Sequence, residues 1–424
     1  MAATDIPKTK NINMYYIPEN IIKENNLPEW FKGCNTIGDY HPLHKKHNVE
    51  KFVKVESVEL ISVSRLFYSN NVRGLEYMKI DTEGHDCIIL KGLYEYLRYL
   101  PDNFHPREIK FESNEHTNPE NIDKIISLYE SFDYYLVSRD YDTVLKKVKN
   151  VKLLCNWTDS ESVCAQWNRY NTEKGIRFTS KNPDYYVIIN HPINNEYYEA
   201  DKTIVFQMEP WVYDESKNWG IKTWGEWARP DESKFLRVYK EKNLFVNSFN
   251  GENIKQNKIN RIVSICSSKN QDTGHILRNN FIRRLEAEIN MIDVFGRDNY
   301  HNFSSYVGQL EDDKTFNGYS KYKYAFTAEN NAEDNYATEK IYEPIMCECL
   351  CFYWGCPNLE EFLNPMAFVR LDLNDVEGSL ATVKKAIEED WWSKRIDVIR
   401  KEKERIMKEL NFFKKMEDII ESCE

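Results

Sequence analysis

The sequence predicts an α/β protein in which helices cover parallel sheets, spread over two or three domains. Short apolar runs suited to buried strands alternate with amphipathic stretches along most of the chain, which is typical of βαβ units. The length of 424 residues exceeds what one ordinary core accommodates. With 41% hydrophobic and 14% aromatic residues, the composition is that of a globular chain rather than a disordered one.

Charge and hydropathy exclude several classes of function. The net charge of −11 argues against nucleic acid as the main partner. The apolar runs are far shorter than the ~20 residues that span a bilayer, and residues 1–16 lack the apolar core of a signal peptide. The ten cysteines are unpatterned, so we expect reduced thiols and a cytoplasmic protein, in a host cytoplasm if the source is viral.

The first predicted domain covers residues 1–150. Its first fifty residues are polar and are expected to be irregular, anchored by Trp30 and Cys34. The three-residue spacing in HPLHKKH, residues 41–47, admits a metal site, but a solvated loop is the favoured interpretation because no cysteine or carboxylate accompanies the histidines. A βαβαβ layer follows, with strands over 75–81, 108–112 and 134–138 and helices over 87–100 and 122–132.

The stretches YMKIDTEGHDCIILKG (77–92) and REIKFESN (107–114) resemble FkbM-type S-adenosylmethionine-dependent methyltransferases over about residues 55–147. The resemblance covers only the second half of that fold. The glycine-rich turn that would grip the cofactor has no counterpart upstream, so S-adenosylmethionine is not expected to bind. Asp81, Glu83 and Asp86 are expected to be structural rather than catalytic or metal-binding. A half-sheet exposes an edge, so this part should dock on a neighbour or self-associate, and a homo-oligomer stays open.

The second predicted domain covers residues 151–257. Strands are expected over 151–155, 185–190 and 203–208, and Glu209 follows the last of them directly. Open α/β sheets place active groups on loops that leave the carboxyl ends of parallel strands. Four tryptophans follow and predict either a sugar-stacking surface or packing between domains, and the sequence does not decide between the two. They are Trp211, Trp219, Trp224 and Trp227.

The third predicted domain covers residues 258–378, and its centre is the stretch 322–362. A strand over 323–328 leads into a polar loop, Thr338 occupies a helix N-cap position, and a second strand covers 350–354 before Gly355-Cys356-Pro357. The free N–H groups and the positive dipole end of such a helix suit a phosphate. Other expected elements are strands over 261–266, 291–295 and 368–371 and a helix over 275–285.

Two further features of this region admit alternatives. Residues 379–424 are helical with an apolar stripe, and a packing or dimerising role is favoured over a membrane-surface helix because the charges are mixed. Cys347, Cys349, Cys351 and Cys356 are read as packing thiols rather than zinc ligands, because they straddle a helix end, a strand and a turn.

Residues 322–369 are similar to the signature of glycosyltransferase family 10, the α-1,3/4-fucosyltransferases. The residues that carry the resemblance are Tyr322, Lys323, Glu329, Asn330, Tyr336, Thr338, Glu339, Lys340, Trp354, Gly355, Pro357 and Phe362 to Pro365. A weaker likeness reaches upstream through Arg278 and Glu209, so that it covers about residues 151–373. The resemblance implies a GT-B architecture, two Rossmann-like domains, here preceded by a partial Rossmann-like methyltransferase domain.

The resemblance also implies an inverting transfer of fucose from GDP-fucose to a hydroxyl of a glycan acceptor, without a required cofactor. Carried onto this chain, Glu209 would be the general base, and Arg278 and Lys340 would contact the diphosphate. Glu339 would contact the ribose. The remaining donor-site residues implied by the resemblance are Glu329, Asn330, Tyr336 and Thr338. Another GDP-sugar, a bifunctional glycosyltransferase and methyltransferase, and a non-catalytic glycan-binding scaffold are the alternatives that the sequence leaves open.

Overall fold

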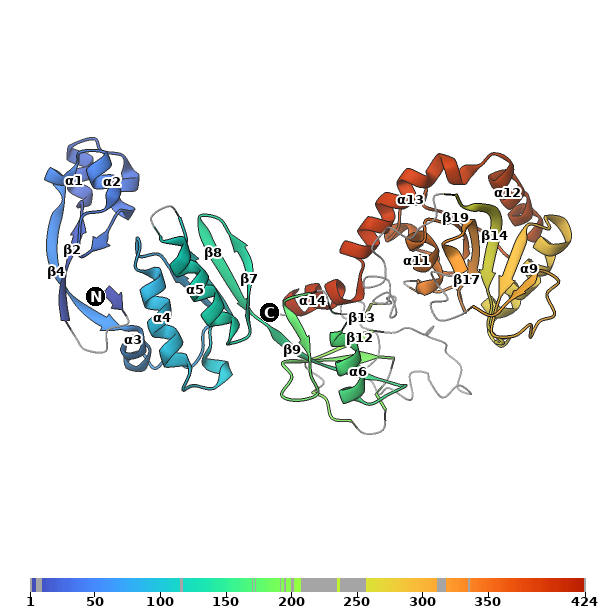
Figure 1. The fold of residues 1–424 in the computed structure, drawn as a ribbon, viewed down its shortest axis with the longest axis horizontal. Coiled ribbons are helices and arrows are strands. Elements are labelled where there is room, and N and C mark those ends of the chain that lie inside the picture. Colours follow the sequence, from blue (N-terminus) through green and yellow to red (C-terminus); the bar gives the residue numbers. More distant parts are fainter. Residues whose placement is uncertain are drawn as a thin grey trace. The chain divides into compact units, whose positions relative to one another are not determined.

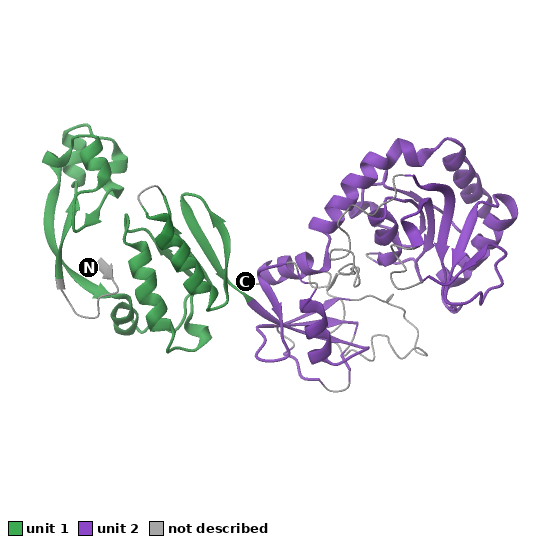
Figure 2. Ribbon diagram, in the orientation of Figure 1, with its two compact units in different colours: residues 1–148 green, residues 149–424 purple. Residues whose placement is uncertain are grey.

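The computed structural model describes residues 2–4, 10–114, 117–169, 171, 173–190, 192–193, 196–199, 202–206, 235–236, 257–310, 318–334 and 336–422. It divides into two compact units, residues 1–148 and residues 149–424 (Figures 1 and 2). The predicted first boundary, at residue 150, lies next to this division. No helix in the described ranges has both the length and the apolar composition needed to cross a bilayer.

The first unit holds two four-stranded sheets, ordered β1-β4-β2-β3 and β5-β6-β8-β7. Its strands are β1 (Ala2–Thr4), β2 (Lys10–Tyr16), β3 (Thr36–Ile37), β4 (Lys54–Ser62), β5 (Tyr77–Ile80), β6 (Glu108–Glu112), β7 (Tyr134–Arg139) and β8 (Asp142–Lys147). Its α-helices are α1 (Glu19–Glu24), α2 (Pro42–Lys46), α3 (Val63–Ser69), α4 (Asp86–Leu97) and α5 (Pro119–Glu130). Helices α4 and α5 supply much of the core that covers the second sheet.

The expectation that the first fifty residues are irregular is wrong. Strand β2 pairs antiparallel with β4 from Lys10 opposite Leu60 to Tyr16 opposite Lys54, and a small separate core packs around Phe31. Cys34 is buried in that core as expected, whereas Trp30 is 45% exposed and is not an anchor. The composition concealed the strand because Lys10, Asn11 and Asn13 occupy three of the first four positions of KNINMYY.

The predicted parallel βαβαβ layer is also wrong in its last step. Strands β5 and β6 are parallel, but β8 is inserted antiparallel between β6 and β7. The short connection through Asp140 and Tyr141 makes β7 and β8 a hairpin, and strands joined so closely can pair only antiparallel. Residues 142–147 were not expected to form a strand.

The solvated-loop interpretation of the histidines fails for two of the three. His41 and His44 are buried, at 1% and 0% exposure, on the short helix α2. His41 caps that helix by accepting the Leu43 N–H on Nδ1 at 3.1 Å, and its Nε2 contacts Glu83 at 2.9 Å.

The described residues of the second unit form two sheets, and every strand pair recorded in them is parallel. The first sheet, ordered β10-β9-β11-β12-β13, contains β9 (Lys149–Cys155), β10 (Ile176–Phe178), β11 (Tyr185–Ile189), β12 (Thr203–Phe206) and β13 (Phe235–Leu236). The second, ordered β16-β15-β14-β17-β18-β19, contains β14 (Ile259–Ile265), β15 (Ile292–Phe295), β16 (Tyr306–Gly308), β17 (Tyr322–Ala328), β18 (Leu350–Trp354) and β19 (Phe368–Arg370). The predicted pair of Rossmann-like sheets is thus present.

The α-helices of the second unit are α6 (Ser160–Asn168), α9 (Thr273–Glu288), α11 (Glu339–Met346), α12 (Val376–Glu388), α13 (Trp391–Lys408) and α14 (Phe412–Ser422). The last three form the predicted C-terminal helical region, and they pack on both sheets (Figure 1). Ile399 and Ile406 of α13 join the core of the six-stranded sheet. Phe412 and Phe413 of α14 join the core of the five-stranded sheet, where Phe412 meets Trp167 edge to face. The stripe is therefore a packing face.

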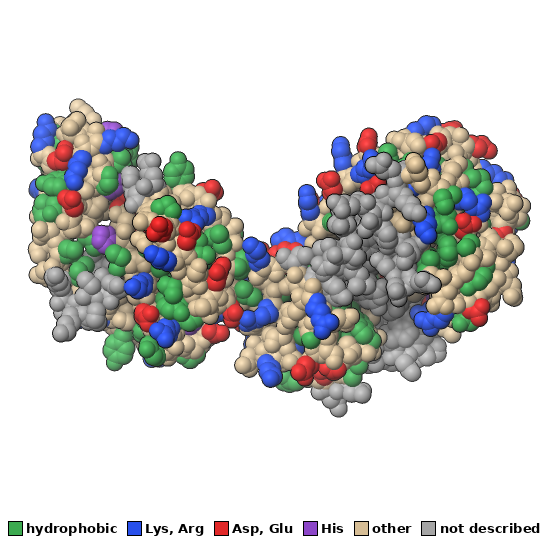
Figure 3. All heavy atoms as spheres, in the orientation of Figure 1, with side chains coloured by type: hydrophobic (Ala, Val, Ile, Leu, Met, Phe, Trp, Pro, Cys, Tyr) green, Lys and Arg blue, Asp and Glu red, His purple; other side chains and the backbone are tan. Residues whose placement is uncertain are grey.

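Basic and acidic side chains are mixed on one face of the described part of the molecule. On the face shown in Figure 3, Lys and Arg side chains are interspersed with Asp and Glu over both units.

The four cysteines Cys347, Cys349, Cys351 and Cys356 are fully buried, and within the described part of the chain they form no group with metal-ligand spacing.

Candidate functional site

A cavity of about 580 Å³ opens at the carboxyl edge of the six-stranded sheet. The chain leaves β14 for β15 on one side, and it later returns to β17 on the other side of β14. The strand order therefore reverses between β14 and β17, and open α/β sheets bind ligands at such a switch point. The segments that follow β14, β15 and β17 line the cavity, together with the first turns of α9 and α11.

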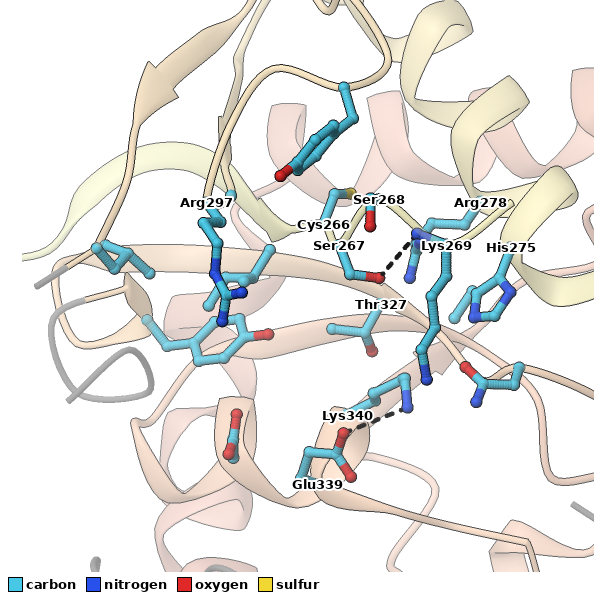
Figure 4. Close-up of a pocket in the computed structure, with 18 of the residues that line it drawn as sticks. Cys266, Ser267, Ser268, Lys269, His275, Arg278, Arg297, Thr327, Glu339 and Lys340 are labelled. Atoms are coloured by element: carbon cyan, nitrogen blue, oxygen red, sulfur yellow. Dashed lines mark hydrogen bonds and ion pairs between the residues drawn. The ribbon is translucent and has the colours of Figure 1, made fainter. Parts of the chain in front are cut away.

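Arg278 brings a buried positive charge to this cavity (Figure 4). It projects from α9, is 4% exposed, and donates from Nε to Asn279 Oδ1 at 3.4 Å. Its Nη2 is wholly buried and has no hydrogen-bond partner within the part of the chain that the structure describes. Because a buried charged N–H without a partner is costly, Nη2 is suited to binding an anion.

The N-terminus of α11 forms the opposite wall. Thr338 is the N-cap, and its Oγ1 accepts the Lys340 backbone N–H at 3.5 Å, as the sequence predicted. Glu339 and Lys340 occupy the first turn and line the cavity, with Lys340 Nζ 3.3 Å from the Glu339 carboxylate (Figure 4). An ammonium group beside the positive dipole end of a helix suits a phosphate.

Glu329 braces this wall from behind instead of lining the cavity. It is fully buried and accepts the Thr338 backbone N–H at 2.8 Å and the Thr338 hydroxyl at 2.6 Å. The Tyr353 hydroxyl donates to it at 3.2 Å, and Lys340 Nζ lies 3.3 Å away. Burial raises the pKa of the Glu329 carboxyl, whereas the Lys340 ammonium and the Thr338 hydrogen bonds oppose that rise. The carboxylate holds Thr338 and Lys340 in place.

Two glycines allow backbone segments to approach at this point. A Cβ on Gly274 would collide with the carbonyl oxygens of Glu329 and Asn330, and the Gly274 N–H donates to the Asn330 carbonyl at 2.9 Å. Gly355 has φ of +153°, and a Cβ there would collide with the Glu329 side chain and lie 2.7 Å from the Tyr353 hydroxyl. Only glycine fits either position without displacement of the brace.

His275 lines the cavity beside Arg278 (Figure 4). Its ring is almost fully buried, and burial together with the neighbouring Arg278 charge lowers the pKa of the imidazole to about 4. The ring is therefore neutral near pH 7.

Most of the donor-site residues expected from the sequence come together here. Arg278, Asn330, Tyr336, Glu339 and Lys340 all line the same cavity. Thr338 and Glu329 stand directly behind them as cap and brace. The predicted base Glu209 and the four tryptophans that follow it lie outside the described residues.

Sequence reasoning missed several polar residues of the lining. Lys269 follows β14 and Arg297 follows β15, and both extend toward the cavity (Figure 4). Their position on loops at the carboxyl ends of parallel strands was an available signal. His275 and Glu343 had no comparable signal, because their place depends on how α9 and α11 are rotated about their axes. Glu339 and Glu343 partly offset the four basic side chains of the lining.

The first unit carries a separate group of carboxylates. Single oxygens of Asp81, Glu83 and Glu112 lie within 4.8 Å of one another. Burial, reinforced by the neighbouring carboxylates, raises the pKa of Glu112 to about 7. Asp86 is fully buried and accepts from the Thr82 hydroxyl at 3.0 Å and from the Glu112 backbone N–H at 3.4 Å, which secures the turn before α4 to strand β6. The resemblance of this unit to FkbM-type methyltransferases stays a prediction.

Comparison with known proteins identifies the domain that holds the cavity. Residues 253–410 match the family model described as glycosyltransferase family 10 (fucosyltransferase), C-terminal part. No curated protein matches the chain.

Solved structures similar to this chain include an alpha1,3-fucosyltransferase, 14% identical, with 58% of this chain and 81% of that one covered and a TM-score of 0.36. A structure of an alpha1,3-fucosyltransferase with GDP-fucose is 14% identical, with 59% of this chain and 81% of that one covered and a TM-score of 0.35. A glycosyltransferase from Rickettsia africae ESF-5 is 12% identical, with 82% and 98% covered and a TM-score of 0.36. The assignment depends on the family model and on the observed sheet topology. Residues 253–410 thus form a glycosyltransferase family 10 (fucosyltransferase) domain, and the protein that carries it is a glycosyltransferase.

Proposed function

We propose that the protein is an inverting fucosyltransferase that transfers fucose from GDP-fucose to a hydroxyl of a glycan. The observation that carries the proposal is the buried Arg278 guanidinium, whose Nη2 has no hydrogen-bond partner in the described ranges and which lines a cavity at the switch point of a parallel sheet. The family match over residues 253–410 supports the class of donor.

The leaving diphosphate is the anion that this site suits best. Arg278 and Lys340 supply two fixed positive charges, and the N-terminus of α11 adds the positive end of its helix dipole. Negative charge develops on the diphosphate as the bond to the sugar breaks, so groups already in place stabilise the transition state without reorganisation. The proposed reaction requires no metal ion, because these groups already supply the positive charge.

The remaining roles follow from the resemblance and from the position of each residue. Asn330 and Tyr336 line the cavity and would contact the donor, and Glu339 would hold the ribose hydroxyls. Glu329 and Thr338 act through Lys340 and through the helix N-terminus, as brace and cap.

The acceptor side of the reaction depends on Glu209. Its carboxylate would take the proton of the acceptor hydroxyl while the hydroxyl oxygen forms a bond to the anomeric carbon. The bond from that carbon to the diphosphate breaks on the opposite face, GDP leaves, and the configuration inverts. We expect this to take place in the cytoplasm, and the cysteines of the described ranges are all free, which suits a reducing compartment.

A donor screen with the full chain tests the proposal. Release of GDP or UDP would be measured for GDP-fucose, other GDP-sugars and UDP-sugars, each over a panel of glycan acceptors. We expect turnover with GDP-fucose and loss of that turnover in Lys340→Met. Lys384→Met, which removes a 42% exposed lysine on α12, is the matched control and should leave turnover unchanged.

The other outcomes have separate meanings. GDP binding without turnover of any donor would indicate a non-catalytic scaffold, and failure to bind GDP at millimolar concentration would overturn the proposed function. Calorimetric binding of S-adenosylmethionine would support the bifunctional alternative and contradict the expectation drawn from the missing glycine turn.

A further inference from the structure

Tyr353 carries a buried hydroxyl group whose hydrogen bonds have a fixed direction. It lies on β18, is fully buried, and belongs to the core of the six-stranded sheet. Its oxygen accepts the Cys356 backbone N–H at 3.1 Å. Because a backbone N–H can only donate, the phenol proton is left for Glu329, whose Oε1 lies 3.2 Å away. Burial raises the pKa of Tyr353 well above its ordinary value, so the phenol keeps this proton near neutral pH.

The Glu329 carboxylate receives two donors on each oxygen within the described ranges. Oε1 accepts from the Tyr353 hydroxyl and, at 2.8 Å, from the Thr338 backbone N–H. Oε2 accepts from the Thr338 hydroxyl at 2.6 Å and lies 3.3 Å from Lys340 Nζ. The two oxygens of an ionised carboxylate offer about four lone-pair sites, so this set of donors fits the ionised form. A proton on either oxygen would turn one acceptor into a donor that faces another donor.

Lys340 depends on this carboxylate for its position at the cavity. Its ammonium group also donates to Thr338 Oγ1 at 3.3 Å, and that hydroxyl in turn donates to Glu329. Lys340 lines the cavity, whereas Tyr353 stands behind the wall with Glu329. The phenol hydroxyl can therefore affect a ligand only through the carboxylate and the ammonium group that the carboxylate holds.

We propose that Tyr353 is a positioning residue of the proposed donor site, because its hydroxyl keeps Glu329 in the ionised form that holds Thr338 and Lys340 at the cavity wall. Burial raises the pKa of the Glu329 carboxyl and the Glu339 carboxylate adds to that rise, whereas Lys340 and Thr338 oppose it. A donor to the charged form also lowers the pKa, so loss of the phenol hydroxyl would raise the pKa of Glu329 further. The inference rests on the proposed function, in which Lys340 contacts the diphosphate.

Three neutral ionisable groups near Glu329 keep one charge state across the neutral range. They are Tyr342 on α11, Cys351 on β18 and, from the start of α9 that contacts the Glu329 backbone, His275. Burial raises the pKa of this phenol and of this thiol well above neutral, and it lowers the pKa of the imidazole to about 4. Glu329 is therefore the group whose protonation would respond to loss of the Tyr353 hydroxyl.

Tyr353→Phe removes the hydroxyl and leaves the ring in the core. Binding of GDP-fucose would be measured by calorimetry between about pH 6 and pH 8, beside the wild-type protein, because the doubly esterified diphosphate of this ligand does not titrate there. We expect the variant to bind within about threefold of wild type at the upper end and about tenfold more weakly at the lower end. The sign follows from the raised pKa of Glu329, since its carboxylate is lost as the pH falls.

Tyr324→Phe is the matched control. Tyr324 lies on β17 of the same sheet, is fully buried, and donates from its hydroxyl to the Ala386 carbonyl at 3.2 Å, behind the core rather than at the cavity. This variant should lower the melting temperature, because a buried hydrogen bond is lost, and bind GDP-fucose as wild type does at every pH.

Glu329→Gln provides a second test that does not depend on the stability of Tyr353→Phe. It removes the charge that holds Lys340, so GDP-fucose binding should weaken about tenfold with no dependence on pH in the same range. Addition of Tyr353→Phe to this variant should change the affinity less than about twofold further, because both substitutions act through one carboxylate.

The two levels of proposal fail in different ways. If the wild-type protein does not bind GDP-fucose, the proposed function is overturned and this inference falls with it. If the wild-type protein binds but Tyr353→Phe loses the same affinity at every pH, or Tyr324→Phe loses as much, the phenol hydroxyl contributes only to packing and the positioning role is refuted. Wild-type affinity in Glu329→Gln would refute it as well.

Discussion

Replacement of Arg278 by methionine should weaken GDP binding and stabilise the ligand-free protein at the same time. Methionine fills a similar volume without a charge. If Arg278 contacts the diphosphate, the variant loses a buried charge-assisted interaction worth about 2–4 kcal/mol, which corresponds to roughly 30- to 1,000-fold weaker GDP binding. In the absence of ligand, the wild-type protein holds a buried Nη2 without a partner in the described ranges, and the variant does not.

The two effects have opposite signs, and this makes the prediction specific. Removal of an unsatisfied buried donor raises the free energy of unfolding of the ligand-free variant by on the order of 1 kcal/mol, and loss of the hydrogen bond to Asn279 offsets part of this gain. The melting temperature of the ligand-free variant should therefore be equal to that of wild type or ~1–4 °C higher. Most substitutions of buried residues lower the melting temperature instead.

Calorimetry with GDP and thermal unfolding without ligand are the two measurements. Arg284→Met is the matched control, because Arg284 lies on the same helix, is 39% exposed, and pairs with Glu288 and Glu377 on the surface. It should bind GDP as wild type does. The reasoning is refuted if Arg278→Met binds GDP normally, or if it loses affinity only together with a large drop in melting temperature.

Three further predictions concern other parts of the chain. Glu209→Gln should lower kcat by about 10²- to 10⁴-fold in a GDP-release assay and leave the Kd for GDP unchanged, and an unaffected kcat would exclude Glu209 as the base. Gly355→Ala should destabilise the protein by ~2–4 kcal/mol in urea unfolding and impair GDP binding, because the new Cβ collides with the Glu329 side chain. Gly33→Ala is the neutral control, because a Cβ at that position meets open space. Glu112 has a pKa raised to about 7, so between that value and its ordinary pKa of about 4.5 the folded state keeps a proton that the unfolded state releases, and wild-type stability falls as pH rises through this window. Glu112→Gln should remove this fall in stability, which is on the order of 1 kcal/mol after allowance for solvent screening. An equal slope of stability against pH in both proteins between about pH 5 and pH 8 would contradict the prediction.

The sequence predicted the centre of the family 10 domain well because the signals there are local. Thr338 followed by Glu339 and Lys340 is a helix start by its own chemistry, and the structure places the cap at that threonine. The apolar run of β18 is long enough to indicate a strand without knowledge of its neighbours. The local sequence alone is enough to assign elements such as these.

Other features depend on contacts that no local pattern encodes. Glu329 looks the same in sequence whether it faces a ligand or braces a helix, and the difference depends on Thr338 and on Tyr353 in the next strand. Strand β2 was missed because its own residues do not favour a strand strongly, and its hydrogen bonds to β4 are what stabilise it. Arg297 was missed because a single arginine after a strand is common and acquires meaning only when β14 lies beside β15.

The position of α14 has a consequence for how the protein is made. Phe412, Phe413, Met416 and Ile420 complete the core of the five-stranded sheet, although the strands of that sheet are synthesised much earlier. A ribosome adds about 5–20 residues per second, so this apolar face waits many seconds for its cover, even if the six-stranded sheet has already folded. The five-stranded sheet therefore completes its core only after α14 has been synthesised, and during that interval the nascent chain offers an apolar surface that a chaperone can bind.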